Sequence, residues 1–461
     1  MNENEDFSGR LHFLSGVIVL IIAVLIGRAA YLQIYEGELY TRLAEGNRIR
    51  IIPAEAARGT FYDRNGELLV TNRPGFTVSL LPLTEPISME VIARVSKLIN
   101  VPVAEIQKKI DAHVGFDPIR IKNDVLPDIV TVIEEQKDEY PGVVIEVLPV
   151  RDYIYGEYAA HVFGYVSEIN EEELEKRKGE GYKSGYIIGK FGLERVYDKE
   201  VRGVNGGDQV EVDVSGRPVQ ILGRQSPVPG NDLVLTIDKH IQEAAERAVD
   251  EQLAAVHANA AAAVVMNPQT GEVLAMVSRP AFNPNLFAGG ISTQNWNVLN
   301  NNPFHPMDNK AITGEYPPGS TFKIVTGTAA LAEHKVTPQE KIFDSGRHWL
   351  IPKTNAAGEA LGWINFQQAM AHSDNVYFYE MGNRLGVDTL ERYARMFGLG
   401  QRTGVDLPYE AEGLVPNRKY KKDNYEDGDW YLSETFDAAI GQGFNLVTPL
   451  QAAMVMGEIA A

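Results

Sequence analysis

The sequence predicts a mixed α+β protein with one N-terminal transmembrane helix, and three observations carry that prediction. Residues 11–27 form an apolar run without a charged side chain, which is close to the length that a membrane-spanning helix needs. Residues 58–71 have the pattern of two strands joined by an Asn-Gly turn. Residues 322–331 are rich in Ala, Thr and Val and follow a stiff Pro-Pro-Gly turn, so they predict a buried helix.

Composition excludes several classes of function. The 461 residues carry a formal net charge of −19, which argues against a nucleic-acid-binding surface, since such surfaces need basic patches. Cysteine is absent, so disulfides, thiol catalysis and cysteine-ligated zinc are excluded. His305 and His348 are isolated in the sequence, and we predict neither a metal site nor a cofactor.

The apolar run near the N-terminus is interpreted as an uncleaved membrane anchor over residues 11–34, preceded by a short tail at residues 1–10. The alternatives are a cleaved signal peptide, which normally has a shorter apolar region and a small-residue cleavage site, and a buried core helix. The charges do not support a cytoplasmic N-terminus, because Arg10 alone precedes the run whereas Arg28 and Arg42 follow it.

Residues 35–230 are predicted to form a non-catalytic α+β region. Amphipathic helices are expected at residues 87–99 and 103–112, a strand at 143–150 and a charged, solvated helix at 171–178. We interpret the charges of residues 58–66 as local ion pairs rather than as a catalytic site. Two prolines and a glycine within residues 225–231 indicate a boundary.

Beyond that boundary the pattern predicts a sheet with helices packed on it. Residues 233–237 indicate a strand and residues 241–253 a helix. Residues 261–266 and 273–277 indicate two strands on either side of a turn. Residues 280–307 are rich in Asn and Pro, and we expect a long loop there that shapes the approach to Ser320.

Ser320 and Lys323 are the first candidate catalytic residues. Ser320 is expected at a helix N-terminus, where free N–H groups favour developing negative charge. Lys323 lies one helical turn further on, so its amine falls on the same face as the hydroxyl. Such a pair can be a nucleophile and its base. Taken alone, the two residues are better explained by an N-cap serine beside a solvated lysine.

A second polar group follows in the segment Ser373-Asp374-Asn375. It interrupts two predicted helices, at residues 366–372 and 376–385, so it should form a short loop between them. Such a loop can point polar side chains into a cleft, but taken alone a helix-capping loop is the simpler reading. Residues 441–450 predict turns before a final helix.

Together these motifs resemble those of the class B penicillin-binding proteins, and more the elongation type than the septal type. Tyr-Pro-Pro-Gly-Ser-Thr-Phe-Lys at residues 316–323 matches the first active-site motif, and Ser373-Asp374-Asn375 matches the second. Residues 58–66 and 189–194 match motifs of the family's pedestal, and residues 440–449 match the stretch before its third active-site motif.

The resemblance implies an elongated α+β pedestal at residues 35–230 and a transpeptidase domain of the serine β-lactamase type at residues 231–461. It implies D-alanyl-D-alanine transpeptidation of peptidoglycan during cell elongation, with Ser320 as the acylated nucleophile and Lys323 as its base. Ser373 would relay protons toward the leaving group, and Asn375 would hydrogen-bond the substrate or the lysine.

The resemblance also implies where the protein works and what it meets. It implies a single-pass protein of the cytoplasmic membrane, with residues 1–10 in the cytoplasm and the catalytic domain outside. The implied partners are stem peptides that end in D-Ala-D-Ala, β-lactam antibiotics and a RodA-type SEDS glycan polymerase.

The sequence departs from the family pattern at its end. The family's third motif, Lys-Thr/Ser-Gly, should follow residue 443, but no such triplet occurs there, and the Lys-Ser-Gly at residues 183–185 lies in the pedestal region. We therefore expect the chain to be a fragment of a longer protein, incomplete at the C-terminus of its transpeptidase domain. The alternatives to a transpeptidase are a non-catalytic cell-wall scaffold with the same fold, and a β-lactamase or β-lactam sensor.

Overall fold

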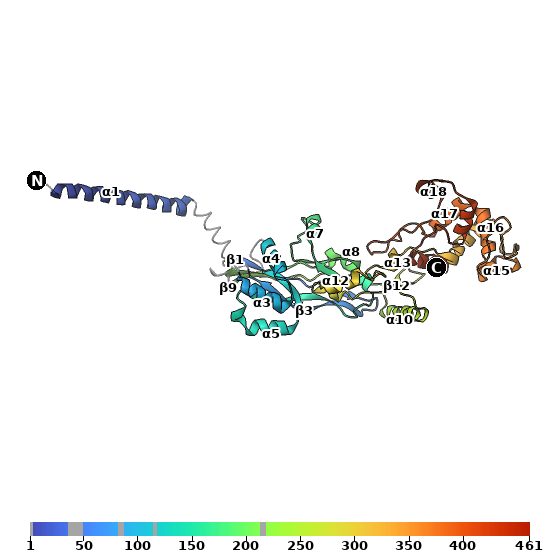
Figure 1. Ribbon diagram of the computed structural model, residues 1–461, viewed down its shortest axis with the longest axis horizontal. Helices are drawn as coiled ribbons and strands as arrows, with labels where there is room; N and C mark the ends of the chain where they lie inside the picture. Colours follow the sequence, from blue (N-terminus) through green and yellow to red (C-terminus); the bar gives the residue numbers. More distant parts are fainter. Residues whose placement is uncertain (1–2, 36–48, 82–86, 114–117, 213–217) are drawn as a thin grey trace. The chain divides into compact units, whose positions relative to one another are not determined.

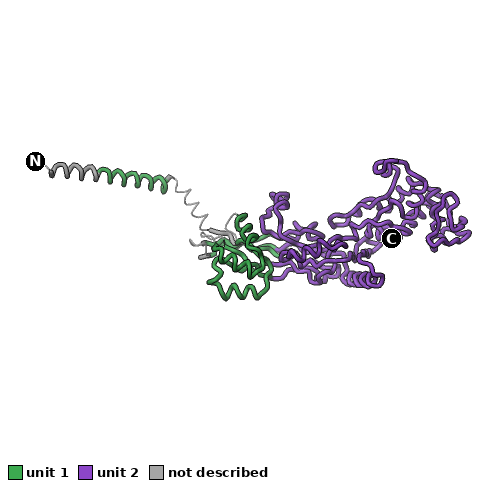
Figure 2. Tube along the Cα trace, viewed as in Figure 1, with its two compact units in different colours: residues 1–57, 75–148, 204–228 green, residues 58–74, 149–203, 229–461 purple. Residues whose placement is uncertain are grey.

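The computed structural model describes residues 3–35, 49–81, 87–113, 118–212 and 218–461, and its helices and strands confirm the mixed α+β class (Figure 1). The chain divides into two compact units, each of which is assembled from segments that are distant in sequence (Figure 2). Unit 1 comprises residues 1–57, 75–148 and 204–228, and unit 2 comprises residues 58–74, 149–203 and 229–461. The linear division of the chain near residue 230 stays a prediction.

The N-terminal segment forms the helix α1 (Glu3–Ala30), which continues into the short π-helix η1 (Tyr31–Tyr35). From Gly16 to Ile34 the segment has a mean hydropathy of 2.3, and none of it is buried within the protein. Its 19 residues span about 28 Å, close to the ~30 Å of a bilayer's hydrocarbon core. Within the described residues this helix alone is long and apolar enough to cross a membrane, and its exposure contradicts the alternative of a buried core helix. Arg42 lies outside the described residues.

Unit 1 consists of helices packed on strands. Its elements are β1 (Ile49–Ala54), part of β3 (Leu68–Leu80), α3 (Met89–Ile99), α4 (Val103–Ala112), β4 (Ile119–Val125), α5 (Pro127–Glu135), η2 (Lys137–Glu139), part of β5 (Val143–Tyr153), β8 (Gly206–Val212) and β9 (Pro218–Gln225). The strands β1, β8 and β9 form an antiparallel sheet in that order, and β3 pairs with β4 in antiparallel register, Val78 opposite Lys122.

The helix predicted at residues 87–99 is confirmed as α3. It begins at Met89 because the hydroxyl of Ser88 accepts a hydrogen bond from the backbone N–H of Val91. It ends where Asn100 adopts a left-handed conformation, with φ of 53°. The buried side chains of α3 recur at helical spacing and join the core of unit 1: Val91, Ile92, Val95 and Ile99.

Unit 2 carries two groups of elements besides the start of β3 and the end of β5. The first group is β2 (Phe61–Tyr62), α6 (Ala160–Phe163), β6 (Val166–Glu168), α7 (Glu171–Lys176), β7 (Ile187–Gly189), α8 (Gly192–Val196), α9 (Asp198–Val201), β10 (Leu233–Val234), α10 (Lys239–Val256), β11 (Ala261–Met266), β12 (Val273–Arg279), α11 (Asn285–Ala288), α12 (Thr293–Asn300) and α13 (Lys310–Thr313). The strands β11 and β12 are antiparallel, and α10 packs on them, as predicted.

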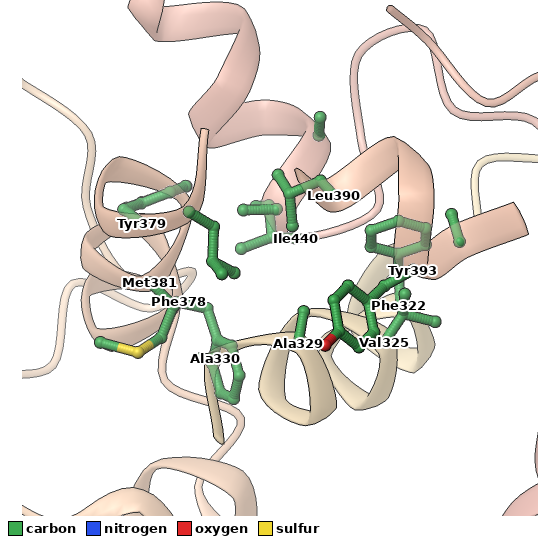
Figure 3. Close-up of a cluster of buried hydrophobic side chains, with 14 of the residues drawn as sticks. Phe322, Val325, Ala329, Ala330, Phe378, Tyr379, Met381, Leu390, Tyr393 and Ile440 are labelled. Atoms are coloured by element: carbon green, nitrogen blue, oxygen red, sulfur yellow. The ribbon is translucent and has the colours of Figure 1, made fainter. Parts of the chain in front are cut away.

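The second group is mainly helical and surrounds the Ser320 segment. It comprises η3 (Gly319–Phe322), α14 (Lys323–Ala332), β13 (Ile342–Asp344), β14 (Gly362–Ile364), α15 (Phe366–Ala371), α16 (Asn375–Leu385), α17 (Val387–Met396), α18 (Arg418–Asn424), α19 (Leu432–Ala439) and α20 (Pro449–Ala460). The helix α14 is mostly buried in an apolar cluster to which α16, α17 and residue Ile440 also contribute (Figure 3).

The long loop predicted over residues 280–307 is wrong, because this stretch contains α11 and α12. The side-chain oxygen of Ser292 accepts a hydrogen bond from the backbone N–H of Asn295 and so caps α12. Asparagine is a weak helix former, and the three asparagines of this short helix obscured its periodicity.

The prediction that the charges of residues 58–66 pair locally is wrong for Arg58. This buried guanidinium contacts the carboxylate of Glu194 at 2.6 Å and that of Asp198 at 2.9 Å, which are 136 and 140 residues further along the chain. Arg151 donates to the other oxygen of Glu194 at 2.5 Å. Glu194 is fully buried between the two arginines, and this cluster ties the segment before β2 to β5, α8 and α9 within unit 2.

Replacement of Glu194 by alanine is expected to destabilise unit 2 strongly, because it leaves the buried guanidinium of Arg151 without its carboxylate and that of Arg58 with Asp198 alone. Breaking such a buried ion pair costs about 3–5 kcal/mol. The measurement is thermal unfolding of the detergent-solubilised protein by circular dichroism, in which Glu194→Ala should lower the melting temperature by several degrees. Glu172→Ala is the matched control, since its ion pair with Lys176 is exposed; equal melting temperatures for both variants would contradict the prediction.

Candidate active site

Ser320 lies in a turn that a distant segment holds in place. The backbones of Tyr316 and Val447 exchange two hydrogen bonds of 2.9 Å, and the N–H of Gly319 donates to the carbonyl of Gly441 at 2.9 Å. Gly319 has φ of +56°, a conformation that glycine adopts without strain. The 3₁₀ turn η3 then leads directly into α14, so Ser320 precedes the buried helix, as predicted, and its side chain is exposed.

Gly441 explains why the Gly-Gln-Gly stretch comes so close to this turn. A Cβ atom at position 441 would lie 2.3 Å from the carbonyl oxygen of Gly319 and 2.7 Å from the Cβ atom of Phe322, and Gly441 itself has φ of +70°. Any side chain here would push the Ser320 turn away. The sequence showed a turn at this place but not which segment it contacts.

Lys323 is the first residue of α14, and its side chain is buried with only 1% exposed. Its amine donates hydrogen bonds to the backbone carbonyl of Ser373 at 2.5 Å, to the hydroxyl of Ser373 at 3.1 Å and to Oδ1 of Asn375 at 2.7 Å. Burial lowers the pKa of Lys323 to about 8, although the charges of Asp374 and Glu359 act in the opposite direction. A solvated lysine, the alternative to a functional one, is therefore contradicted.

The hydroxyl of Ser373 lies between the other two groups. It donates to Oγ of Ser320 at 2.9 Å while it accepts from the Lys323 amine. Sequence reasoning placed the lysine beside Ser320 on one helix face and did not show that a third side chain, 53 residues away in sequence, links the two. Hydroxyl groups both donate and accept, so this arrangement can pass a proton from Ser320 toward Lys323.

The segment that carries Ser373 is confirmed as a connection between two helices. Ser373 has φ of +54°, and Asp374 caps α16 by accepting from the backbone N–H of Tyr377 at 2.6 Å. The capping interpretation is thus correct for Asp374, while Ser373 and Asn375 contact the amine of Lys323. One segment both begins a helix and contributes two polar groups to the site.

The geometry brings all four predicted site residues together and assembles what covalent acyl transfer needs: an exposed hydroxyl, a buried amine whose pKa approaches neutrality, and a hydroxyl that connects them. The Lys-Ser-Gly at residues 183–185 lies in the connection before β7 and, within the described part of the chain, has no hydrogen bond with these four residues. Among the described residues, no group of three or more His, Asp or Glu side chains could hold a metal ion.

Sequence reasoning missed three buried residues behind this site: Asp344, Asn355 and Asp374 as an interacting group. Asn355 is 2% exposed and lies in an irregular segment, 20 residues before Asn375. No local pattern distinguishes it from an ordinary loop asparagine.

Two domain models of penicillin-binding proteins match the chain, one in each half. Residues 53–235 match the penicillin-binding protein dimerisation domain, and residues 261–461 match the penicillin-binding protein transpeptidase domain. The peptidoglycan D,D-transpeptidase MrdA of Acinetobacter baumannii is 36% identical over 459 residues, which cover 98% of this chain and 67% of that protein.

Solved structures of penicillin-binding proteins are also similar to this chain. The penicillin-binding protein PBP2 of Helicobacter pylori, in its complex with MreC, superposes with a TM-score of 0.78 at 27% identity and covers 90% of this chain and 77% of that one. A chain from a peptidoglycan synthase complex, whose structure concerns the coordination of polymerization and crosslinking, gives a TM-score of 0.69 at 32% identity, covering 98% and 78%. The protein therefore belongs to the penicillin-binding proteins that combine a dimerisation domain with a transpeptidase domain.

Proposed function

We propose that Ser320 is the residue on which this peptidoglycan D,D-transpeptidase of cell-wall synthesis forms its acyl-enzyme. The observation that carries the proposal is the unbroken hydrogen-bonded path from Oγ of Ser320 through the Ser373 hydroxyl to the buried amine of Lys323. Serine needs an adjacent base to become a nucleophile, and within the described residues Lys323 is the basic side chain that this path reaches.

The proposed reaction gives each of the four residues a role. Oγ of Ser320 attacks the carbonyl carbon of the penultimate D-alanine of a stem peptide, and its proton passes by way of Ser373 to the neutral amine of Lys323. The amide bond breaks as Lys323 returns this proton by way of Ser373 to the nitrogen of the terminal D-alanine, which leaves as a free amine. An amine of a second stem peptide then attacks the ester, its proton passes through the same residues to Oγ of Ser320, and the ester bond breaks to complete the cross-link. Asn375 holds the Lys323 amine toward Ser373. β-Lactams would acylate the same serine as their ring opens.

The rate of acylation should depend on pH through Lys323, because only the uncharged amine can accept a proton. Burial lowers the pKa of this amine to about 8, so below that pH the protonated fraction grows and the rate should fall about tenfold for each pH unit. The measurement is the second-order rate constant for acylation by a fluorescent penicillin at a series of pH values, with thermal unfolding recorded at each pH to exclude loss of fold. A rate that stays constant well below the pKa would contradict the role of Lys323 as base.

We also propose a topology for the chain in the membrane. The apolar helix α1 supports a single-pass protein of the cytoplasmic membrane, and we place residues 1–10 in the cytoplasm and the transpeptidase domain outside, where stem peptides are cross-linked. The Helicobacter pylori relative binds MreC, and another relative belongs to a synthase complex that couples polymerization to crosslinking. The synthase complex supports a glycan polymerase as partner, and we propose that this polymerase is of the RodA type and that the two proteins work in cell elongation.

The test of the proposed function is covalent labelling of the full-length protein in detergent with a fluorescent penicillin, followed by peptide mapping by mass spectrometry. We expect one penicilloyl group on the peptide that contains Ser320, and we expect it to persist, because the acyl-enzyme with a β-lactam deacylates slowly. Absence of label, or label on another residue, would overturn the assignment of Ser320. Rapid release of hydrolysed penicillin would favour a β-lactamase instead.

A further inference from the structure

We propose that Asn355 is a positioning residue for acylation: it holds the Ser373–Asn375 segment in the place from which that segment directs the Lys323 amine. This inference rests on the proposed function of Ser320 and Lys323. Asn355 touches neither of them. It acts through the Ser373–Asn375 segment, which contacts both residues. Asn355 itself lies between β13 and β14, in a segment that contains none of the four predicted site residues.

The side-chain oxygen of Asn355 accepts two hydrogen bonds from the start of α16. The backbone N–H of Asn375 donates to it at 2.7 Å, and that of Val376 donates at 3.1 Å. The first N–H groups of a helix have no partner within the helix, and here a remote side chain satisfies two of them. Because Oδ1 of Asn375 is one of the acceptors that fix the Lys323 amine, Asn355 sets the position of a residue in direct contact with the base.

The side-chain nitrogen of Asn355 lies between two buried carboxylates. It donates to Oδ2 of Asp344 at 3.0 Å and to Oδ2 of Asp374 at 3.0 Å, and it also contacts the backbone carbonyl of Glu359 at 3.0 Å. Asp344 and Asp374 are each 1% exposed. Two carboxylates buried this close together repel each other when both are ionised, and the amide group between them offsets part of that repulsion.

The charge of Asp374 affects the pKa of Lys323. Burial and the nearby Asp344 raise the pKa of Asp374 to about 6, while hydrogen bonds from Tyr377 and Asn355 act in the opposite direction. Ionised Asp374 and Glu359 in turn raise the pKa of Lys323 against the effect of burial. By favouring the charged form of Asp374, Asn355 therefore influences both the place and the basicity of the Lys323 amine.

The test compares Asn355→Ala with the wild-type protein, full-length and in detergent, by the pH dependence of acylation by a fluorescent penicillin. Without the amide the pKa of Asp374 rises, so Asp374 loses its charge at higher pH and the pKa of Lys323 falls. The rate should drop about 10- to 100-fold at its maximum, as misplacement of a catalytic group does. Its acid limb should move to lower pH by about one unit.

A matched control separates this role from a purely structural one. Asn309 is also fully buried and also caps a helix, since it accepts from the backbone N–H of Ala311 at 3.2 Å in α13. Asn309→Ala should lower the melting temperature without moving the acid limb. Asn355→Ser, which keeps a small hydrogen-bonding side chain, is the variant to use if Asn355→Ala does not fold.

Three results would overturn the inference. One is an acylation rate within about twofold of the wild-type rate for a folded Asn355 variant, since the expected loss is much larger. Another is a loss of rate with an unmoved acid limb, and the third is failure of both Asn355 variants to fold, which would make Asn355 a residue of the fold alone. If wild-type protein is itself not acylated on Ser320, the proposed function fails instead, so the two failures are distinguishable.

Discussion

Replacement of Ser320 by alanine is expected to abolish covalent labelling by penicillin. The variant removes the oxygen that we propose forms the ester, and the loss of a nucleophilic serine costs on the order of 10⁶-fold in rate in a serine protease. The measurement is gel fluorescence of the full-length protein after incubation with a fluorescent penicillin, together with its melting temperature.

Thr321→Ala is the control for this experiment. Thr321 carries the neighbouring hydroxyl, which is also exposed and donates to the carbonyl of Pro318 at 2.8 Å. Its removal changes the same turn by a similar volume and leaves the path from Ser320 to Lys323 intact, so labelling should remain close to that of wild type. Persistent labelling of Ser320→Ala at the wild-type level would show that another residue is the nucleophile.

Replacement of Lys323 by methionine should have the second largest effect. General base catalysis contributes about 10²- to 10⁴-fold, and we expect acylation to slow toward the upper end of that range, because the variant also removes the donor that holds Ser373 and Asn375. Methionine has a similar length and suits a buried site beside the ring of Phe378, so the fold should survive. The measurement is the second-order rate constant for acylation, with thermal unfolding as the check on folding.

Lys310→Met provides the comparison for that variant. Lys310 is a partly buried lysine of the same unit whose pKa is also lowered by burial, and its amine donates to the carbonyl of His305 at 2.8 Å. It has no hydrogen bond to Ser320, Ser373 or Asn375 among the described residues. Loss of acylation in Lys310→Met but not in Lys323→Met would contradict the assignment of Lys323 as base.

Sequence reasoning succeeded where local patterns govern structure. The helix at residues 103–112 was predicted with its observed bounds as α4, and the strands at residues 261–266 and 273–277 appear as β11 and β12, the second of them two residues longer. It failed at α12, where asparagines weaken the helical signal, and at Arg58, whose carboxylate partners come from far along the chain. Helical periodicity and turn chemistry are local, whereas ion-pair partners in a core depend on which segments meet.

What the sequence by itself determined was the chemistry available to this protein: a serine and a lysine one turn apart at the start of a buried helix, and a polar Ser-Asp-Asn connection between two helices. Only the tertiary structure decided how these groups act together. It placed Ser373 between Ser320 and Lys323, buried the amine so that its pKa falls, and brought Asn355 and two carboxylates behind the site. The physical reason is that burial and hydrogen bonding between residues 19 to 53 positions apart arise only when the chain has packed.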